Sequence, residues 1–299
     1  MKEYQIFSDS SCDLPEVLVN EHKIKVIPFY VTFDKDNYYK ENTEITNEAF
    51  YDKLSQKNMF SITKFPTVQD YTTEFKRTLE EGKDIVCICL SNQLSGSYQN
   101  AVYAKEVLDE QFPDANVYII DSFQATAGQG LLLLQLAYMK KAGFSLEAAV
   151  HKLELIRTTS RIIFTVDKMT YFEKGRIMGK VAALARSMFG LKPLIQLKDA
   201  ELVNCSSARG RDKALQKVLT MVEEYFIESN EKPSYYDFCI VNATTEEEAA
   251  YLRREVEHFI RRAILYPVFQ IGVTIGSYTG SGGIGISFIK KYNYVFSEP

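Results

Sequence analysis

Hydroxyl side chains stand at three places in the sequence where a predicted strand gives way to a predicted helix. The run Ser8-Asp9-Ser10-Ser11 follows the first strand, Thr63 precedes one helix and Ser95 precedes another. The first turn of a helix presents unpaired backbone N–H groups and a partial positive charge. Gly96 lacks a side chain, so an anion can approach the backbone beside Ser95 closely. These residue types at these places could bind a carboxylate or a phosphate.

Each of these polar groups also has a purely structural interpretation. Ser95 could act only as a cap for the helix that follows it. Thr67 and Asp70 have the spacing of a capping box, which gives Thr67 a structural role and leaves Thr63 free to face a ligand. For Asp9 we favour hydrogen bonds within its own loop over a role in orienting hydroxyl groups. The local sequence therefore leaves both interpretations of Ser95 open.

Other chemistries are poorly supported by the sequence. The stretch from Gly276 to Gly285 contains G-S-G-G-I-G, a formal match to the dinucleotide fingerprint, but the chain ends at residue 299, 14 residues after Gly285. That fingerprint needs a helix, a second strand and an acidic residue about 20 positions later. We interpret the stretch as a tight turn between strands or a loop closing over a ligand. His22, His151 and His258 lack metal-binding spacing and no G-x-S-x-G motif is present, so we expect no metal, no cofactor and no nucleophilic serine.

The first half of the chain has the alternation of strands and helices that is typical of a parallel sheet. The predicted strands are Tyr4 to Phe7, Ile24 to Phe33, Asp84 to Leu90 and Asn116 to Ile120, and the predicted helices are 47–56, 97–111, 125–141 and 145–157. Ser95 then lies at the carboxyl end of the strand beginning at Asp84. Ligands of open α/β sheets bind at that edge.

The second half has a different pattern. We expect strands at 161–166, 236–242, 268–275 and 284–289, a hairpin of 194–198 with 201–204, and helices at 178–189, 213–228 and 245–262. A hairpin, long helices and late strands without strict alternation favour an α+β domain. The predicted fold class is therefore α/β, with a parallel-sheet domain at residues 1–160 and an α+β domain at residues 161–299.

Composition limits the classes of partner. The chain carries 35 Lys and Arg against 39 Asp and Glu, a formal charge of −4, so no global charge attracts nucleic acid or an anionic membrane. The most apolar segment, Leu131 to Met139, is far shorter than the about 20 residues of a membrane span. We therefore expect no stable membrane insertion. The five cysteines show no C-x-x-C spacing and the N-terminus lacks a secretory signal, which predicts reduced thiols and a cytoplasmic location.

A set of short motifs in a fixed order resembles the DegV family. The motifs are SDSSCDLP (8–15), TKFPT (63–67), LSNQLSGSYQNA (90–101), DSFQATAGQG (121–130), GRI (175–177), LKPLIQLKDAEL (191–202), ARGRDKA (208–214) and GSYTGSGGIG (276–285). The resemblance spans residues 6–286, and the ordered set is more specific than any one motif.

This resemblance implies a non-enzymatic protein that holds a long-chain fatty acid between two domains. The protein would present the carboxylate to a separate ATP-dependent kinase subunit, which makes an acyl phosphate. By the same likeness Thr63, Ser95 and the N–H of Gly96 would hold the carboxylate, and Arg209 would dock the kinase. The terminal motif of the family carries a histidine near the carboxylate; Tyr278 stands there in this chain, and a phenol stays neutral at pH 7.

The acyl chain needs an apolar wall. Val181, Leu184, Ala185, Met188 and Phe189 form a helical stripe, and Phe164 and Phe269 stand on predicted strands of the same half. The stripe suits either ordinary core or a tunnel wall. Two other functions stay open: an enzyme acting on a small anionic substrate at the same helix start, and a lipid-sensing regulatory protein.

Overall fold

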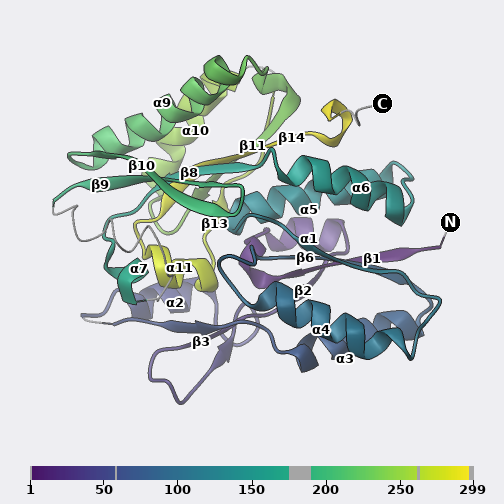
Figure 1. Cartoon of the computed structure of the whole chain (residues 1–299). Helices are drawn as coiled ribbons and strands as arrows, with labels where there is room; N and C mark the ends of the chain where they lie inside the picture. The colour runs from purple at the N-terminus through teal and green to yellow at the C-terminus, as the bar shows by residue number, and fades with distance from the viewer. Residues whose placement is uncertain (1, 58, 175–189, 261–262, 296–299) are drawn as a thin grey trace.

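The computed structural model describes the whole chain except residues 1, 58, 175–189, 261–262 and 296–299. Its described strands form three sheets: a parallel sheet, a larger mixed sheet and a small antiparallel sheet. Figure 1 shows that the two larger sheets are stacked with helices between them and on both outer faces. The N-terminal half of the chain builds the parallel and the small sheet.

The parallel sheet has the strand order β2-β1-β6-β7. Its strands are β1 (Tyr4–Asp9), β2 (Lys25–Ile27), β6 (Asp84–Cys89) and β7 (Val117–Asp121). Strand β6 is buried on both faces along its whole length, as a central parallel strand between two helix layers should be. The polar residues that follow β1 and β6 consequently meet at the carboxyl edge of this sheet.

The mixed sheet has the order β10-β9-β8-β14-β11-β12, with β13 also paired to β11. Its strands are β8 (Arg161–Thr165), β9 (Lys192–Lys198), β10 (Glu201–Ala208), β11 (Tyr236–Asn242), β12 (Ile264–Leu265), β13 (Phe269–Gln270) and β14 (Ile284–Lys290). Strands β9 and β10 form the predicted hairpin. Its turn residues Asp199 and Ala200 both have positive φ, the conformation of a tight two-residue hairpin turn.

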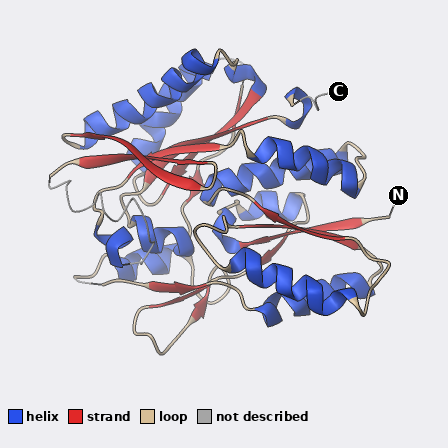
Figure 2. Ribbon diagram, in the orientation of Figure 1, coloured by secondary structure: helices blue, strands red, loops and turns tan. Residues whose placement is uncertain are grey.

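Three helix layers separate and cover the two larger sheets. Helices α3 and α4 cover the outer face of the parallel sheet, α5 and α6 lie between the sheets, and α9 and α10 cover the outer face of the mixed sheet, as Figures 1 and 2 show. Their bounds are α3 (Val68–Glu80), α4 (Ser97–Asp109), α5 (Thr126–Lys141), α6 (Leu146–Arg157), α9 (Arg211–Ser229) and α10 (Glu246–Ile260). Helix α5 contacts both sheets and buries apolar side chains all round, because neither of its faces meets water.

The small sheet, of order β4-β3-β5, stands beside this stack and supports the last helix of the chain. Its strands are β3 (Tyr30–Thr32), β4 (Tyr39–Lys40) and β5 (Ile62–Lys64). Nearby are α2 (Asn47–Leu54), α7 (Thr170–Lys174) and α11 (Val273–Thr279); the remaining short helices are α1 (Glu16–Glu21), η1 (Ser10–Cys12), η2 (Pro233–Tyr235) and η3 (Tyr292–Tyr294). Helix α11 packs against α2, β3, β5 and η1, so the C-terminal part of the chain closes onto the N-terminal half.

Two of the predicted strands are wrong. The segment from Ile24 to Phe33 is divided between β2 and β3, which belong to different sheets, because Pro28 has no N–H for a ladder. The segment from Val268 to Ile275 forms only the two residues of β13 and then enters α11. The predicted helix at 178–189 lies outside the described residues.

The fold class agrees with the prediction: a parallel sheet flanked by helices, followed by an α+β half. The described strands before Arg161 belong to the parallel and small sheets, and those from β8 onward, beginning at Arg161, belong to the mixed sheet. The division into domains 1–160 and 161–299 stays a prediction. One apolar core cluster extends across the predicted boundary at residue 160, since it includes Ile6 of β1, Leu131 of α5 and Val241 of β11.

Candidate ligand-binding site

A buried carboxylate fixes the start of α4 against the carboxyl edge of the parallel sheet. Asp9, at the end of β1, is fully buried and accepts hydrogen bonds from the backbone N–H of Leu90 at 2.9 Å and the hydroxyl of Ser97 at 2.6 Å. Burial raises the pKa of Asp9, and hydrogen bonds from Ser11, Ser97, Gln129 and Leu90 oppose that shift. Asp9 thus holds its own loop through Ser11, as expected, and also positions α4, which the sequence did not indicate.

Ser95 and Gly96 lie at the entry of α4. The hydroxyl of Ser95 accepts a hydrogen bond from the N–H of Ser97 at 3.1 Å, so Ser95 satisfies one first-turn N–H of α4, although the N-cap position itself is Gly96. A serine hydroxyl that accepts one bond still has its own O–H to donate, so capping does not prevent contact with a ligand. The ring of Phe65 packs against Gly96, where an added Cβ would lie 2.7 Å from a ring carbon. Any larger residue at position 96 would displace the exposed ring of Phe65.

Thr63 and Tyr278 meet across the interface between the two halves of the chain. The hydroxyl of Thr63 on β5 and the phenol of Tyr278 on α11 are 2.7 Å apart, although 215 residues separate them in sequence. Burial raises the pKa of the Tyr278 phenol, while the hydrogen bond to Thr63 lowers it. Tyr278 therefore contributes a neutral hydroxyl group, as predicted for a phenol at this place.

An apolar cavity lies beside the Tyr278 phenol, and its empty space, open solvent included, is about 530 Å³. Aliphatic and aromatic side chains make up most of its wall, which is formed by Leu94, Ala125, Thr126, Ile162, Phe164, Phe172, Leu197, Leu202, Val241, Ile271, Ile275, Tyr278 and Thr279.

The wall of the cavity draws on both halves of the chain. Of the predicted head-group residues only Tyr278 lines the cavity; Ser95 directly follows the lining residue Leu94, and Thr63 is bonded to Tyr278. Strands β8, β9, β10 and β11 of the mixed sheet supply much of the remaining wall. The arrangement can hold an elongated apolar group next to a small set of hydroxyl and backbone donors.

The predicted tunnel wall is found in part. Phe164 lines the cavity, whereas Phe269 is fully buried in the core and is not among the lining residues, so its prediction as wall is wrong. The stripe Val181, Leu184, Ala185, Met188 and Phe189 lies outside the described residues, as does the GRI motif at 175–177. Thr67 caps α3 in a full capping box with Asp70, as its spacing indicated.

Two buried carboxyl groups near the cavity were missed by the sequence analysis. Asp13 lies beside Thr126 of the cavity wall, and burial followed by the charge of Glu41 raises its pKa well above the ordinary range. Glu41 follows β4 and contacts the start of α11. Asp13 stands in the motif SDSSCDLP, where the sequence analysis gave it no role, and Glu41 belongs to none of the motifs. Only the acidic character of Glu41 in apolar surroundings could have drawn attention to it.

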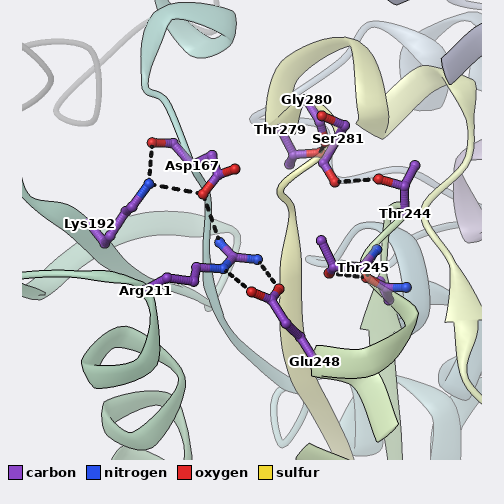
Figure 3. A network of polar contacts seen from close by, with 10 residues as sticks. Asp167, Lys192, Arg211, Thr244, Thr245, Glu248, Thr279, Gly280 and Ser281 are labelled. Carbon is purple, nitrogen blue, oxygen red and sulfur yellow. Dashed lines mark hydrogen bonds and ion pairs between the residues drawn. The ribbon is translucent and has the colours of Figure 1, made fainter. Parts of the chain in front are cut away.

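Arg209 is exposed in the turn between β10 and α9. Two residues later, Arg211 makes a bidentate ion pair with Glu248, at 2.8 and 2.6 Å, and lies 3.4 Å from Asp167 (Figure 3). Asp167 in turn packs against Gly282, in the loop that follows α11. This network brings the turn with Arg209 to the same edge of the molecule as the end of α11.

Among the described residues no group of three or more His, Cys, Asp or Glu side chains could hold a metal ion. The described helices include none that is long and apolar enough to cross a membrane. All five cysteines are described, and each is a free thiol.

The chain belongs to the DegV family. The family model described as "Uncharacterised protein, DegV family" matches residues 3–291. A DegV domain-containing protein of Clostridium perfringens is 30% identical, over 97% of this chain and 98% of that protein.

Two solved structures with the same fold are described as proteins that bind a fatty acid. A protein from Eubacterium ventriosum, described as a fatty acid (stearic acid)-binding protein, superposes with a TM-score of 0.92 at 33% identity, covering 98% of this chain and all of the other. A DegV family protein from Thermus thermophilus, described by its fatty acid binding, gives a TM-score of 0.84 at 26% identity, with 97% and 100% covered. Both superpositions include the parallel-sheet half and the α+β half of this chain.

Proposed function

We propose that this protein binds a long-chain fatty acid between its two halves. The carboxylate would be held by Thr63, Ser95 and the N–H of Gly96, with the acyl chain in the cavity. The observation that carries the proposal is the cavity itself, because its mostly apolar wall includes Tyr278, which is bonded to Thr63, and Leu94, which directly precedes Ser95. The descriptions of the structural relatives from Eubacterium ventriosum and Thermus thermophilus support the same class of ligand.

The expected affinity divides unequally between the tail and the head group. Burial of ten methylene groups at ~0.8 kcal/mol each contributes roughly 8 kcal/mol before the costs of binding are subtracted. A hydrogen bond to a charged group contributes only about 1.5 to 3 kcal/mol. The tail therefore supplies most of the affinity, and the hydroxyl groups decide which end of the ligand faces the entry of α4.

Tyr278 has a specific place in this scheme. Its phenol and the Thr63 hydroxyl form a hydrogen bond of 2.7 Å. A carboxylate that arrives between them can accept from both hydroxyl groups, so their mutual bond is replaced and neither group is left unpaired. No charge on the protein is needed for this exchange, which suits a chain of net charge −4.

We further propose that the protein is a cytoplasmic carrier without catalytic activity of its own. A separate ATP-dependent kinase subunit would phosphorylate the presented carboxylate. Ser95 and Thr63 are half-buried at the entry of α4 and on β5, which keeps a head group within reach of a partner. Arg209 is exposed near the end of α11 and is the proposed docking residue.

Native mass spectrometry of delipidated protein offered oleate or palmitate tests the binding proposal. We expect one fatty acid per chain, and a protein that takes up neither would refute it. Ser95→Ala should lower fatty-acid affinity about tenfold through one lost hydrogen bond. Ser145→Ala is the matched control, since Ser145 also caps a helix, accepting from the N–H of Ala148, but lies away from the cavity wall. If both variants bind the fatty acid with equal affinity, Ser95 has only a structural role at the start of α4 and does not bind the carboxylate.

The kinase step has its own experiment. The fatty-acid-loaded protein, mixed with ATP and a bacterial fatty acid kinase subunit, should yield acyl phosphate, and the protein with ATP alone should yield none. Arg209→Ala should weaken the partner reaction while leaving fatty-acid affinity unchanged. Product formed without the partner would favour the enzyme alternative, and loaded protein that never reacts with the partner would favour the lipid-sensing regulator.

A further inference from the structure

The helix that carries Tyr278 is held at its start by a buried carboxylate from the other half of the chain. Oε1 of Glu41 accepts from the backbone N–H of Thr274 at 2.9 Å, and Oε2 accepts from the Thr274 hydroxyl at 2.6 Å. The hydroxyl of Ser10 donates to the same Oε2 at 2.5 Å. Glu41 is 1% exposed, so these contacts are shielded from water.

Helix α11 cannot hold its position by itself. It has seven residues, and helices of this length are not stable alone in water. Its N-cap, Gly272, offers no side chain to accept from the first-turn N–H groups, which then need an outside partner. Glu41 supplies that acceptor: burial raises the pKa of its carboxyl group, and the hydrogen bonds from Ser10 and Thr274 oppose that shift.

The backbone at this contact leaves no room for another residue type. A Cβ added at Gly272 would lie 2.7 Å from Oε1 of Glu41 and 2.5 Å from Oδ1 of Asp13. The helix start is therefore pressed directly against two carboxyl groups of the N-terminal half. Besides Asp13, the groups that face Glu41 are the hydroxyls of Ser10 and Thr274, and the phenol of Tyr51 lies close by.

The far end of α11 is the end that meets the head-group site. Tyr278 comes one helical turn after Thr274, on the same side of the helix. Its phenol bonds Thr63, and the preceding Ser277 bonds the hydroxyl of Ser61 at 2.8 Å. Glu41 directly follows β4 and Thr63 lies on β5, and these two strands are the edges of one small sheet, since both pair with β3.

We propose that Glu41 is a positioning residue for the head-group site: its carboxylate anchors the start of α11 and thereby places the Tyr278 hydroxyl opposite Thr63. This inference rests on the proposed binding of a fatty acid. Three donor groups converge on the carboxylate, whereas a glutamine amide has a single acceptor oxygen. The charged side chain, and not only its shape, is what the position requires.

The test compares oleic acid with oleyl alcohol, which share a tail and differ at the head. Glu41→Gln removes the charge, and Thr274→Val removes the hydroxyl donor while leaving Glu41 in place. Asp84→Asn is the matched control, because Asp84 is also a buried, hydrogen-bonded carboxylate but stands at the start of β6, at the opposite edge of the sheet from α4. Binding is measured by calorimetry, and folding by thermal unfolding followed by circular dichroism.

Oleic acid should bind at least tenfold more weakly to Glu41→Gln and Thr274→Val, while oleyl alcohol affinity changes less than twofold. Asp84→Asn should keep the wild-type ratio of the two affinities. Adding Tyr278→Phe to Glu41→Gln should cause little further loss, because the phenol is already misplaced.

A folded Glu41→Gln or Thr274→Val protein that keeps the wild-type ratio would overturn the inference. An equal loss for acid and alcohol would also overturn it, since that result shows a general effect on the cavity. If the wild-type protein binds neither ligand, the proposed function itself falls and this inference with it, a result distinct from the other two.

Discussion

Filling the cavity from its β11 wall should block the ligand and stabilise the empty protein at the same time. Val241 is 1% exposed and lines the cavity from near the end of β11. Phenylalanine at this position carries four more carbon atoms than valine, and they would extend into the space that Val241 lines. We therefore expect Val241→Phe to fold and to occupy part of the room that the acyl chain would use.

The magnitude follows from the displaced methylene groups. Four groups at ~0.8 kcal/mol each amount to roughly 3 kcal/mol of lost binding free energy, or about 150-fold in affinity. Filling an apolar cavity commonly raises the free energy of unfolding by about 0.5 to 2 kcal/mol. Ligand affinity and stability of the ligand-free chain should therefore change in opposite directions.

The neighbouring residue on the same strand provides the control. Ile240 is fully buried and belongs to the core cluster on the other face of the sheet, beneath α9 and α10. Ile240→Phe should lower the free energy of unfolding by about 1 to 3 kcal/mol through overpacking and leave oleate affinity unchanged. Calorimetry with oleate and urea unfolding of the delipidated variants measure both quantities.

Two outcomes would refute this reasoning. If Val241→Phe binds oleate as tightly as the wild type while remaining folded, the ligand does not use this cavity. If Ile240→Phe loses as much affinity as Val241→Phe, the effect of both comes from general disturbance of the sheet.

Two further predictions concern stability. Burial raises the pKa of Asp237 to about 6, above the about 3.9 of an unfolded chain, so the folded state prefers the neutral carboxyl group. The contribution of this carboxyl group to the free energy of unfolding is fully present below about pH 4 and is lost as the pH rises through 6, by up to about 3 kcal/mol. Urea unfolding from pH 4 to 8 should show this fall in stability. Asp237→Asn should make the free energy of unfolding less dependent on pH over this range. Thr67→Ala should lower the free energy of unfolding by about 1 kcal/mol through loss of the α3 cap, with oleate affinity unchanged in the same calorimetric assay. A pH profile of Asp237→Asn identical to that of the wild type, or an affinity loss in Thr67→Ala, would contradict these two predictions.

The sequence determined the local elements and part of the site. The apolar run from Asp84 specified a buried parallel strand, and Asp199-Ala200 specified a hairpin turn, because burial and turn chemistry act on neighbouring residues. The capping box at Thr67 was readable for the same reason. Ser95 and Gly96 were found by their place before α4, where a helix start follows a strand.

Tertiary structure alone decided which distant groups meet. The sequence predicts one strand over residues 24–33, but its two parts belong to different sheets. It also predicts a strand over residues 268–275, but the chain enters α11 there, and the carboxylate of Glu41, more than two hundred positions earlier, caps that helix. The contact of Thr63 with Tyr278 likewise joins residues that are far apart in the sequence. Hydrophobic periodicity reports which face of a segment is buried, not which partner buries it. Thr63 and Tyr278 could be named from the sequence as candidate head-group residues, but their meeting at 2.7 Å could not be predicted from it.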